Sequence, residues 1–240
     1  MGHTQDARAF QEIRDTTLEQ LAIFEDLDPE TRQDVVSLAT PRRLKEGDQL
    51  FRQGERATDF FVMLEGYARL QRMTEQGEQI VFHHVSPGQL FGISKVTESA
   101  TYAVTCRAAT DCLILVWPAH QWERVVAAHP GFARHARHTM GARMRELADR
   151  VVDMTTRSVE QRIASTLLRL TSDAGRRTTA GVEIAFPVTR QDIAETTGAT
   201  MHSVSRIMSK WQRAGYVTSS RRKVVLREPD MLSEIAASAA

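Results

Sequence analysis

The 240-residue sequence lacks the features that stabilise secreted or membrane-embedded proteins. It has only two cysteines, Cys106 and Cys112, which cannot form a disulfide framework. Its longest uninterrupted apolar run, residues 113–117, is far too short to cross a bilayer. The first residues are polar and contain no apolar segment of a secretory signal. These absences predict a cytoplasmic, reduced protein with no membrane partner.

An excess of one charge is also missing, because 31 Lys and Arg side chains balance 30 Asp and Glu side chains. Hydrophobic residues make up 42% of the chain and charged residues 25%, which excludes a disordered or fibrous protein. The balance nevertheless varies along the chain. Residues 1–127 have 13 basic and 19 acidic side chains, residues 128–157 have 6 and 3, and residues 158–240 have 12 and 8. An acidic N-terminal part and a basic C-terminal part indicate two domains. The basic domain either binds a polyanion or has a basic surface that faces only solvent.

In the N-terminal half of the chain, the sequence pattern changes from helical to β-type near residue 44. Residues 6–40 have helical spacing, and Asp28 followed by Pro29 is typical of a helix start. From residue 44 to 116, glycines separate short runs rich in β-forming residues. The runs are 60–64, 68–71, 79–85, 102–107 and 112–116. Short strands at this spacing predict an antiparallel β-roll of the jelly-roll type, and therefore an α+β fold.

A long helix without proline is predicted over residues 131–155. Its apolar residues recur at intervals of four and three, which is the pattern of a heptad seam. The seam consists of Met140, Met144, Leu147, Val151 and Met154. The pattern fits either a core helix of a single chain or a parallel contact between two copies, and a strict 3.5-residue period favours the dimer.

In the C-terminal part of the chain, the sequence pattern predicts two helices joined by a tight turn and followed by a hairpin. Thr189 with Asp192 forms a capping pattern, Gly198 provides the turn, and Thr200 caps the second helix. Residues 216–219 and 223–226 are expected to form a hairpin with a basic tip. This combination describes a winged helix-turn-helix, whose second helix enters the major groove of DNA.

The expected DNA contacts follow from that geometry. Arg206 suits bidentate donation to guanine, His202 lies one turn before it, and the wing arginines suit phosphates. A solvated basic helical hairpin is the alternative. The residues predicted to bind DNA are Arg190, Gln191, Thr200, Met201, His202, Ser203, Arg206, Lys210, Arg221 and Arg222.

A family resemblance rests on two segments. Residues 189–217, TRQDIAETTGATMHSVSRIMSKWQRAGYV, resemble the helix-turn-helix of the CRP/FNR superfamily of bacterial transcription regulators. Residues 87–92, PGQLFG, resemble the turn that opens the ligand-binding segment of these regulators. The resemblance implies a β-roll sensor domain over 1–128, a dimerisation helix over 129–156 and a DNA-binding domain over 157–240. It also implies a homodimer on a palindromic operator that recruits RNA polymerase, and no enzymatic activity.

Departures from the family pattern narrow the expected effector. The family usually has a glutamate where this chain has His202, and a histidine there resembles the branch that responds to nitrogen oxides. The glutamate and the Arg-Ser or Arg-Thr pair of cyclic-nucleotide branches are missing, so cAMP is not expected. Four cysteines would be needed for the iron–sulfur cluster of oxygen sensors, and the chain has two.

The effector itself is left open by the sequence. His83 and His84 are adjacent on a predicted strand, so one of them points inward and could ligate a haem that reports nitric oxide. The alternative is an ordinary hydrogen-bonded or exposed pair. The predicted effector pocket comprises His83, His84, Phe91, Tyr102, Met140 and Met144.

Other residues and other functions have simple interpretations. The cysteines fit buried core thiols, with a redox switch as the alternative. His135 and His138 fit a solvated helix end better than a metal pair. A regulator of the same fold that needs no effector stays open. A cupin-like enzyme is disfavoured, because adjacent histidines point to opposite faces and cannot chelate one metal together.

Overall fold

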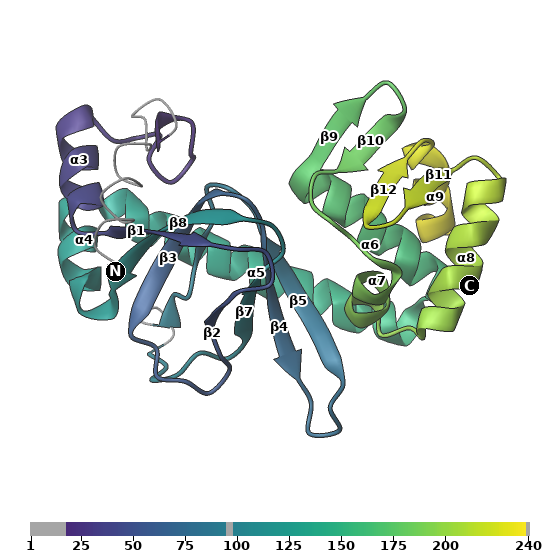
Figure 1. Ribbon diagram of the computed structural model, residues 1–240, viewed down its shortest axis with the longest axis horizontal. Helices are drawn as coiled ribbons and strands as arrows, with labels where there is room; N and C mark the ends of the chain where they lie inside the picture. The colour runs from purple at the N-terminus through teal and green to yellow at the C-terminus, as the bar shows by residue number, and fades with distance from the viewer. Residues whose placement is uncertain (1–17, 95–97, 239–240) are drawn as a thin grey trace. The chain divides into compact units, whose positions relative to one another are not determined.

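The computed structural model describes residues 18–94 and 98–238, which form two compact units (Figure 1). The first unit contains the chain up to residue 72 together with residues 83–144, and the second contains residues 73–82 together with the chain from residue 145. The helical segment expected before residue 18 lies outside the described residues.

The first unit is a β-roll with short helices at its ends. Its elements are α3 (Pro29–Ser37), β1 (Thr40–Leu44), β2 (Gln49–Phe51), β3 (Asp59–Glu65), β4 (Ala68–Met73) up to residue 72, β5 (Gln79–Val85) from residue 83, β6 (Leu90–Phe91), β7 (Thr105–Ala108), β8 (Cys112–Pro118), the 3-10 helix η2 (Ala119–Gln121), α4 (Trp122–Ala128) and the first part of α5 (Pro130–Thr156). The strands form two four-stranded sheets, with orders β1-β8-β3-β6 and β2-β7-β4-β5. The pairings of β8 with β1 and β3 are antiparallel, which confirms the predicted roll.

Two apolar clusters fill this unit. One lies between the helices and the roll and contains Phe60, Trp117, Trp122 and Phe132. The Trp117 indole donates to the Val35 carbonyl at 2.9 Å, which ties α3 to β8. The second cluster is inside the roll and is rich in aromatic rings. Trp117 and Trp122 are therefore packing residues.

The second unit contains α6 (Val159–Ala174), β9 (Gly175–Thr178), β10 (Gly181–Ile184), α7 (Arg190–Thr197), α8 (Met201–Arg213), β11 (Val217–Ser220), β12 (Lys223–Leu226) and α9 (Pro229–Ala237). Its four strands form one sheet in the order β11-β12-β10-β9, and β11 and β12 are the predicted wing. The strands β9 and β10 and the helix α9 were not expected from the sequence.

The predicted α+β architecture is confirmed, with a roll, a long helix and a winged helix-turn-helix. Within residues 18–94 and 98–238, no helix has the length and apolar character needed to span a membrane. In the same residues, no three His, Cys, Asp or Glu side chains are grouped so as to hold a metal ion.

Candidate nucleic-acid interface

The helix-turn-helix is built by two caps and one glycine. The Thr189 side chain accepts from the Asp192 N–H, while the Asp192 carboxylate accepts from the Thr189 N–H at 2.7 Å, which completes a capping box at α7. Gly198 ends α7 with φ +64°, a left-handed conformation that favours glycine. Thr200 then caps α8 by accepting from the Ser203 N–H at 3.2 Å. These three features confirm the predicted turn.

One face of α8 is fixed in the core. Val204, Ile207, Met208 and Trp211 are all buried, as their spacing predicts. Because that face is anchored, the opposite face presents other side chains to solvent. Met201, His202 and Arg206 are exposed, and the apolar Met201 side chain retains 55% of its accessible surface. A cation, an imidazole and a thioether thus project from the first half of α8.

Two of the residues predicted to contact DNA already have partners within the protein. The Lys210 ammonium lies 2.9 Å from a carboxylate oxygen of Glu160 on α6, and the Trp211 indole donates to that same oxygen at 3.0 Å. The Gln191 amide donates to Glu195 at 2.9 Å. Lys210 and Gln191 must therefore break or share these contacts to reach DNA.

The wing and the start of α7 enclose an open cavity of about 570 Å³. Its lining is cationic and rich in hydroxyl groups: Val188, Thr189, Arg190, Ile193, Ser219, Ser220, Arg221, Arg222 and Val224. A hydrogen bond joins the wing to the residues before α7: the Val188 N–H donates to the Arg222 carbonyl at 3.1 Å. Guanidinium and hydroxyl groups are the donors that proteins use on DNA phosphates. The structure thus brings Arg190, a predicted DNA-binding residue at the start of α7, together with the two wing arginines.

The seam on α5 is exposed in the single chain. Met144 is 65% exposed and Val151 62%, and Leu147 and Met154 also face solvent, whereas Met140 packs partly against the first apolar cluster. Four of the five seam residues are thus outside any core of this chain. That exposure argues against the core-helix alternative.

The residues of the predicted effector pocket lie in different places. Phe91 and Tyr102 belong to the aromatic cluster inside the roll, where Phe51 stacks on Tyr102 with a centroid distance of 4.0 Å. The other aromatic side chain of this cluster, Phe61, stacks on Phe91 at 5.2 Å. Met140 contacts the other cluster instead. Phe91 and Tyr102 therefore pack in one cluster and Met140 against the other.

The two adjacent histidines differ in burial, as strand alternation predicts. His84 is buried, and His83 is half-buried with its Nε2 atom 3.0 Å from the Gln89 side-chain oxygen. A haem iron ligated by the Nε2 atom of His83 would have to displace this contact.

The two cysteines are buried, free thiols. Burial raises the pKa of Cys106 far above its ordinary range, and it also raises the pKa of Cys112. Because the thiolate is the reactive species, both side chains fit the interpretation as core thiols better than the redox switch.

Sequence reasoning missed two arginines of α5 that bind backbone carbonyls. Arg143 on α5 donates to the Leu90 carbonyl at 3.0 Å, and Arg150 donates to three carbonyls in the second unit. Both lie among the charged residues of the long helix, which look like ordinary solvated positions. No local signal distinguishes them, because their acceptors lie more than 40 residues away along the chain.

Comparisons with known proteins agree with this geometry. Residues 41–129 match the family model of the cyclic nucleotide-binding domain, and residues 161–235 match that of the Crp-like helix-turn-helix domain. The nitrogen fixation regulation protein FixK of Bradyrhizobium diazoefficiens is 24% identical over 93% of this chain and 93% of its own. The transcriptional activator protein FnrA of Stutzerimonas stutzeri is 24% identical over 82% of this chain and 80% of its own. The solved structure of FixK2 from Bradyrhizobium japonicum shares the fold, with a TM-score of 0.73, 21% identity, and coverage of 84% and 99% of the two chains.

Proposed function

The chain belongs to the CRP/FNR family of transcription regulators and is not an enzyme, and from this premise we propose that it binds a palindromic operator as a homodimer. One observation carries the proposal: the exposed face of α8 and the arginine-lined cavity at the wing belong to the same winged helix-turn-helix. The first supplies groups for base edges, and the second supplies groups for phosphates.

The homodimer is supported by the exposed seam. A helix with Met144, Leu147, Val151 and Met154 in solvent would leave a continuous apolar stripe uncovered. A second copy of the same helix covers that stripe with identical side chains, as in a parallel coiled coil. Two helix-turn-helix units related by a twofold axis would then read two halves of a palindrome, and the bound dimer would contact RNA polymerase.

The experiment that tests DNA binding is selection from a randomised duplex pool by the full-length protein. The expected result is a two-fold symmetric consensus whose half-sites are separated by about one helical turn. Affinity for the selected duplex should exceed affinity for unrelated DNA by about a thousandfold or more. A pool that yields no consensus would contradict sequence-specific binding.

Two candidates remain for the input signal. Nitric oxide or another redox or small-molecule signal is the first, with a haem bound at His83 or His84 as the sensor of nitric oxide. The second is regulation without an effector, which the aromatic packing inside the roll favours, because stacked rings occupy the interior.

Haem titration of the purified protein under anaerobic conditions separates these candidates. A Soret band that saturates at one haem per chain and shifts with nitric oxide supports the first. A broad, non-saturating spectrum, with operator affinity unchanged by nitric oxide, supports the second.

A further inference from the structure

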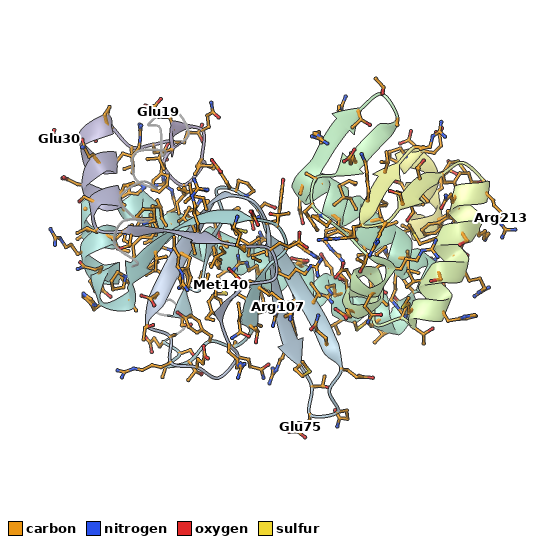
Figure 2. The ribbon with its side chains drawn as sticks, in the orientation of Figure 1. Glu19, Glu30, Glu75, Arg107, Met140 and Arg213 are labelled. Carbon is orange, nitrogen blue, oxygen red and sulfur yellow. The ribbon has the colours of Figure 1, made fainter. Side chains whose placement is uncertain are left out.

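The hairpin between β4 and β5 is part of the unit that contains the helix-turn-helix. We call residues 73–82 the hairpin segment; Figure 2 shows Glu75 at its free end. The segment contacts α7 directly, since the Gln79 amide donates to the Glu195 carboxylate at 2.8 Å. The other oxygen of Glu195 accepts from Gln191, a residue of the proposed DNA interface. A chain of side chains therefore runs from the hairpin segment to that interface.

Arg150 makes a second and more deeply buried connection. This residue of α5 keeps only 7% of its accessible surface. One guanidinium nitrogen, Nη1, donates to the carbonyls of Val81 and Phe82 on β5, at 3.1 and 3.0 Å. The other, Nη2, donates to the Thr196 carbonyl in the last turn of α7, at 2.7 Å. A single planar group thus joins the backbones of β5 and α7.

The electrostatics explain why a buried cation is tolerated here. Burial lowers the pKa of Arg150, but a guanidinium remains charged at neutral pH. The last carbonyls of a helix carry partial negative charge, and α7 has no basic residue of its own in its last turn. Arg150 supplies that charge from another element. Arg162 adds a second bond, from its Nε atom to the Thr197 carbonyl at 3.2 Å.

We propose that Arg150 is a positioning residue that couples the hairpin segment to the helix-turn-helix, so that a shift of β5 moves α7 and the DNA-reading helix α8. The turn between α7 and α8 is short, and its Gly198 is in the left-handed conformation, so a displacement of α7 should carry α8 with it. Coupling free energies are reciprocal, so DNA bound to α8 must also change the stability of the hairpin segment. This inference rests on the proposed binding of DNA by α8.

Hydrogen–deuterium exchange of the full chain tests the coupling, with and without the duplex selected by the wild-type protein. In the wild type, DNA should slow exchange in α7 and α8 and also in residues 79–85. In Arg150→Met, which keeps the length but removes the donors, DNA should still slow exchange in α8. Residues 79–85 should then exchange at the DNA-free rate, and operator affinity should fall about fivefold or more.

The matched control is Arg162→Met. Arg162 holds the same end of α7 from α6, through Thr197, and its other bond goes to the Arg157 carbonyl. This variant should exchange faster in α7 but keep the response of residues 79–85 to DNA. If Arg150→Met fails to fold, Gln79→Ala can be used instead, because it removes the half-buried contact to Glu195. It should reduce the effect of DNA on the exchange of residues 79–85 by at least half.

The outcomes separate the inference from the function on which it rests. If DNA leaves α7 and α8 unchanged in the wild type, both the DNA interface and the coupling are wrong. If DNA protects α7 and α8 but not residues 79–85 in the wild type, only the coupling is wrong. Protection of residues 79–85 that is equal in the wild type and in Arg150→Met overturns the role of Arg150.

Discussion

At the scale of single residues, Arg206 and Lys210 lie one turn apart on α8 but are available to DNA to different degrees. Arg206 is exposed, whereas Lys210 is paired with Glu160 at 2.9 Å. Arg213, labelled in Figure 2, extends from the other end of the same helix. A planar guanidinium near the start of a recognition helix can donate two bonds to one guanine.

Replacement of Arg206 by alanine should therefore cost about 1–3 kcal/mol of specific binding and relax selectivity at one base pair of each half-site. The measurement is affinity for a set of operators that differ at single base pairs. Arg213→Ala removes an exposed arginine from the C-terminal end of α8 and is the control. Unchanged selectivity in Arg206→Ala would contradict the assigned role.

Met201 should read a thymine by its methyl group. It is the first residue of α8, it is 55% exposed, and an apolar side chain in the major groove finds few other apolar partners. Replacing thymine by deoxyuridine removes only that methyl. At one operator position this exchange should weaken wild-type binding about threefold to fivefold, as expected for one buried methyl group. Met201→Ala should bind both duplexes equally, and a uracil scan without effect in the wild type would exclude the contact.

Sequence patterns can predict those contacts that form between residues close together in the chain. The caps at Thr189 and Thr200 could be predicted because each side chain and its acceptor or donor are three residues apart. The pairing of Lys210 with Glu160 could not, because the partner is 50 residues away and only packing brings it close. The carbonyl partners of Arg150 could not be predicted either, because they too are far from it in the sequence. Residues that bind backbone across elements leave no pattern in a single sequence.

At the scale of elements, strand length decided what the sequence showed. The strands β3, β5 and β8 have seven residues each and are rich in apolar and β-forming residues, which is enough to predict them, and the helix α5 is 27 residues long. The strand β6 has two residues and β2 has three, which is too short for any periodicity. The strands β9 and β10 have four residues each and begin with a glycine; β9 has two arginines, and β10 has Glu183 between two apolar residues. Their pairing is determined by the rest of the sheet.

The seam on α5 predicts a change of oligomeric state. Leu147→Glu would place a carboxylate in the apolar contact between two helices, where it lacks a partner. The protein should then sediment as a monomer and lose affinity for a palindromic duplex while keeping its helical content. Asp149→Lys changes charge at an exposed position of the same helix outside the seam, and it should remain dimeric. A dimer that survives Leu147→Glu in sedimentation equilibrium would exclude the seam as the interface.

At the scale of the whole molecule, stability should depend on pH through the buried His129 and the half-buried His135. Burial lowers the pKa of both His129 and His135 below the ordinary value of 6.5, and neighbouring Arg134, Arg143 and His138 lower these pKa values further. The folded state therefore binds fewer protons than the unfolded state. The stabilisation is present above about pH 6.5 and is lost as the pH falls through the folded pKa values.

Thermal unfolding between pH 7 and 5 measures this loss. The melting temperature should fall over that range in the wild type, and the fall should be smaller in His135→Gln. Carboxyl groups with a lowered pKa, such as those of Asp28 and Asp111, act only near and below pH 4, outside this window. His120→Gln changes an exposed histidine and serves as the control. An identical slope in His135→Gln and the wild type would rule out His135 as a source of the pH dependence.

The uneven distribution of charge predicts how salt acts on DNA binding. Residues 158–240 have 12 basic and 8 acidic side chains, and the wing cavity gathers three of the arginines on one surface. Each phosphate neutralised by a cation releases counterions, so the logarithm of affinity falls linearly with the logarithm of salt concentration. Arg221→Ala should weaken binding to all sequences alike and reduce the steepness of that line by about one for each phosphate that Arg221 neutralises in the wild type. Arg42→Ala, an exposed change on β1, should leave both the affinity and the salt dependence unchanged. If instead the weakening in Arg221→Ala depended on the base sequence, the wing would be reading bases and not the backbone.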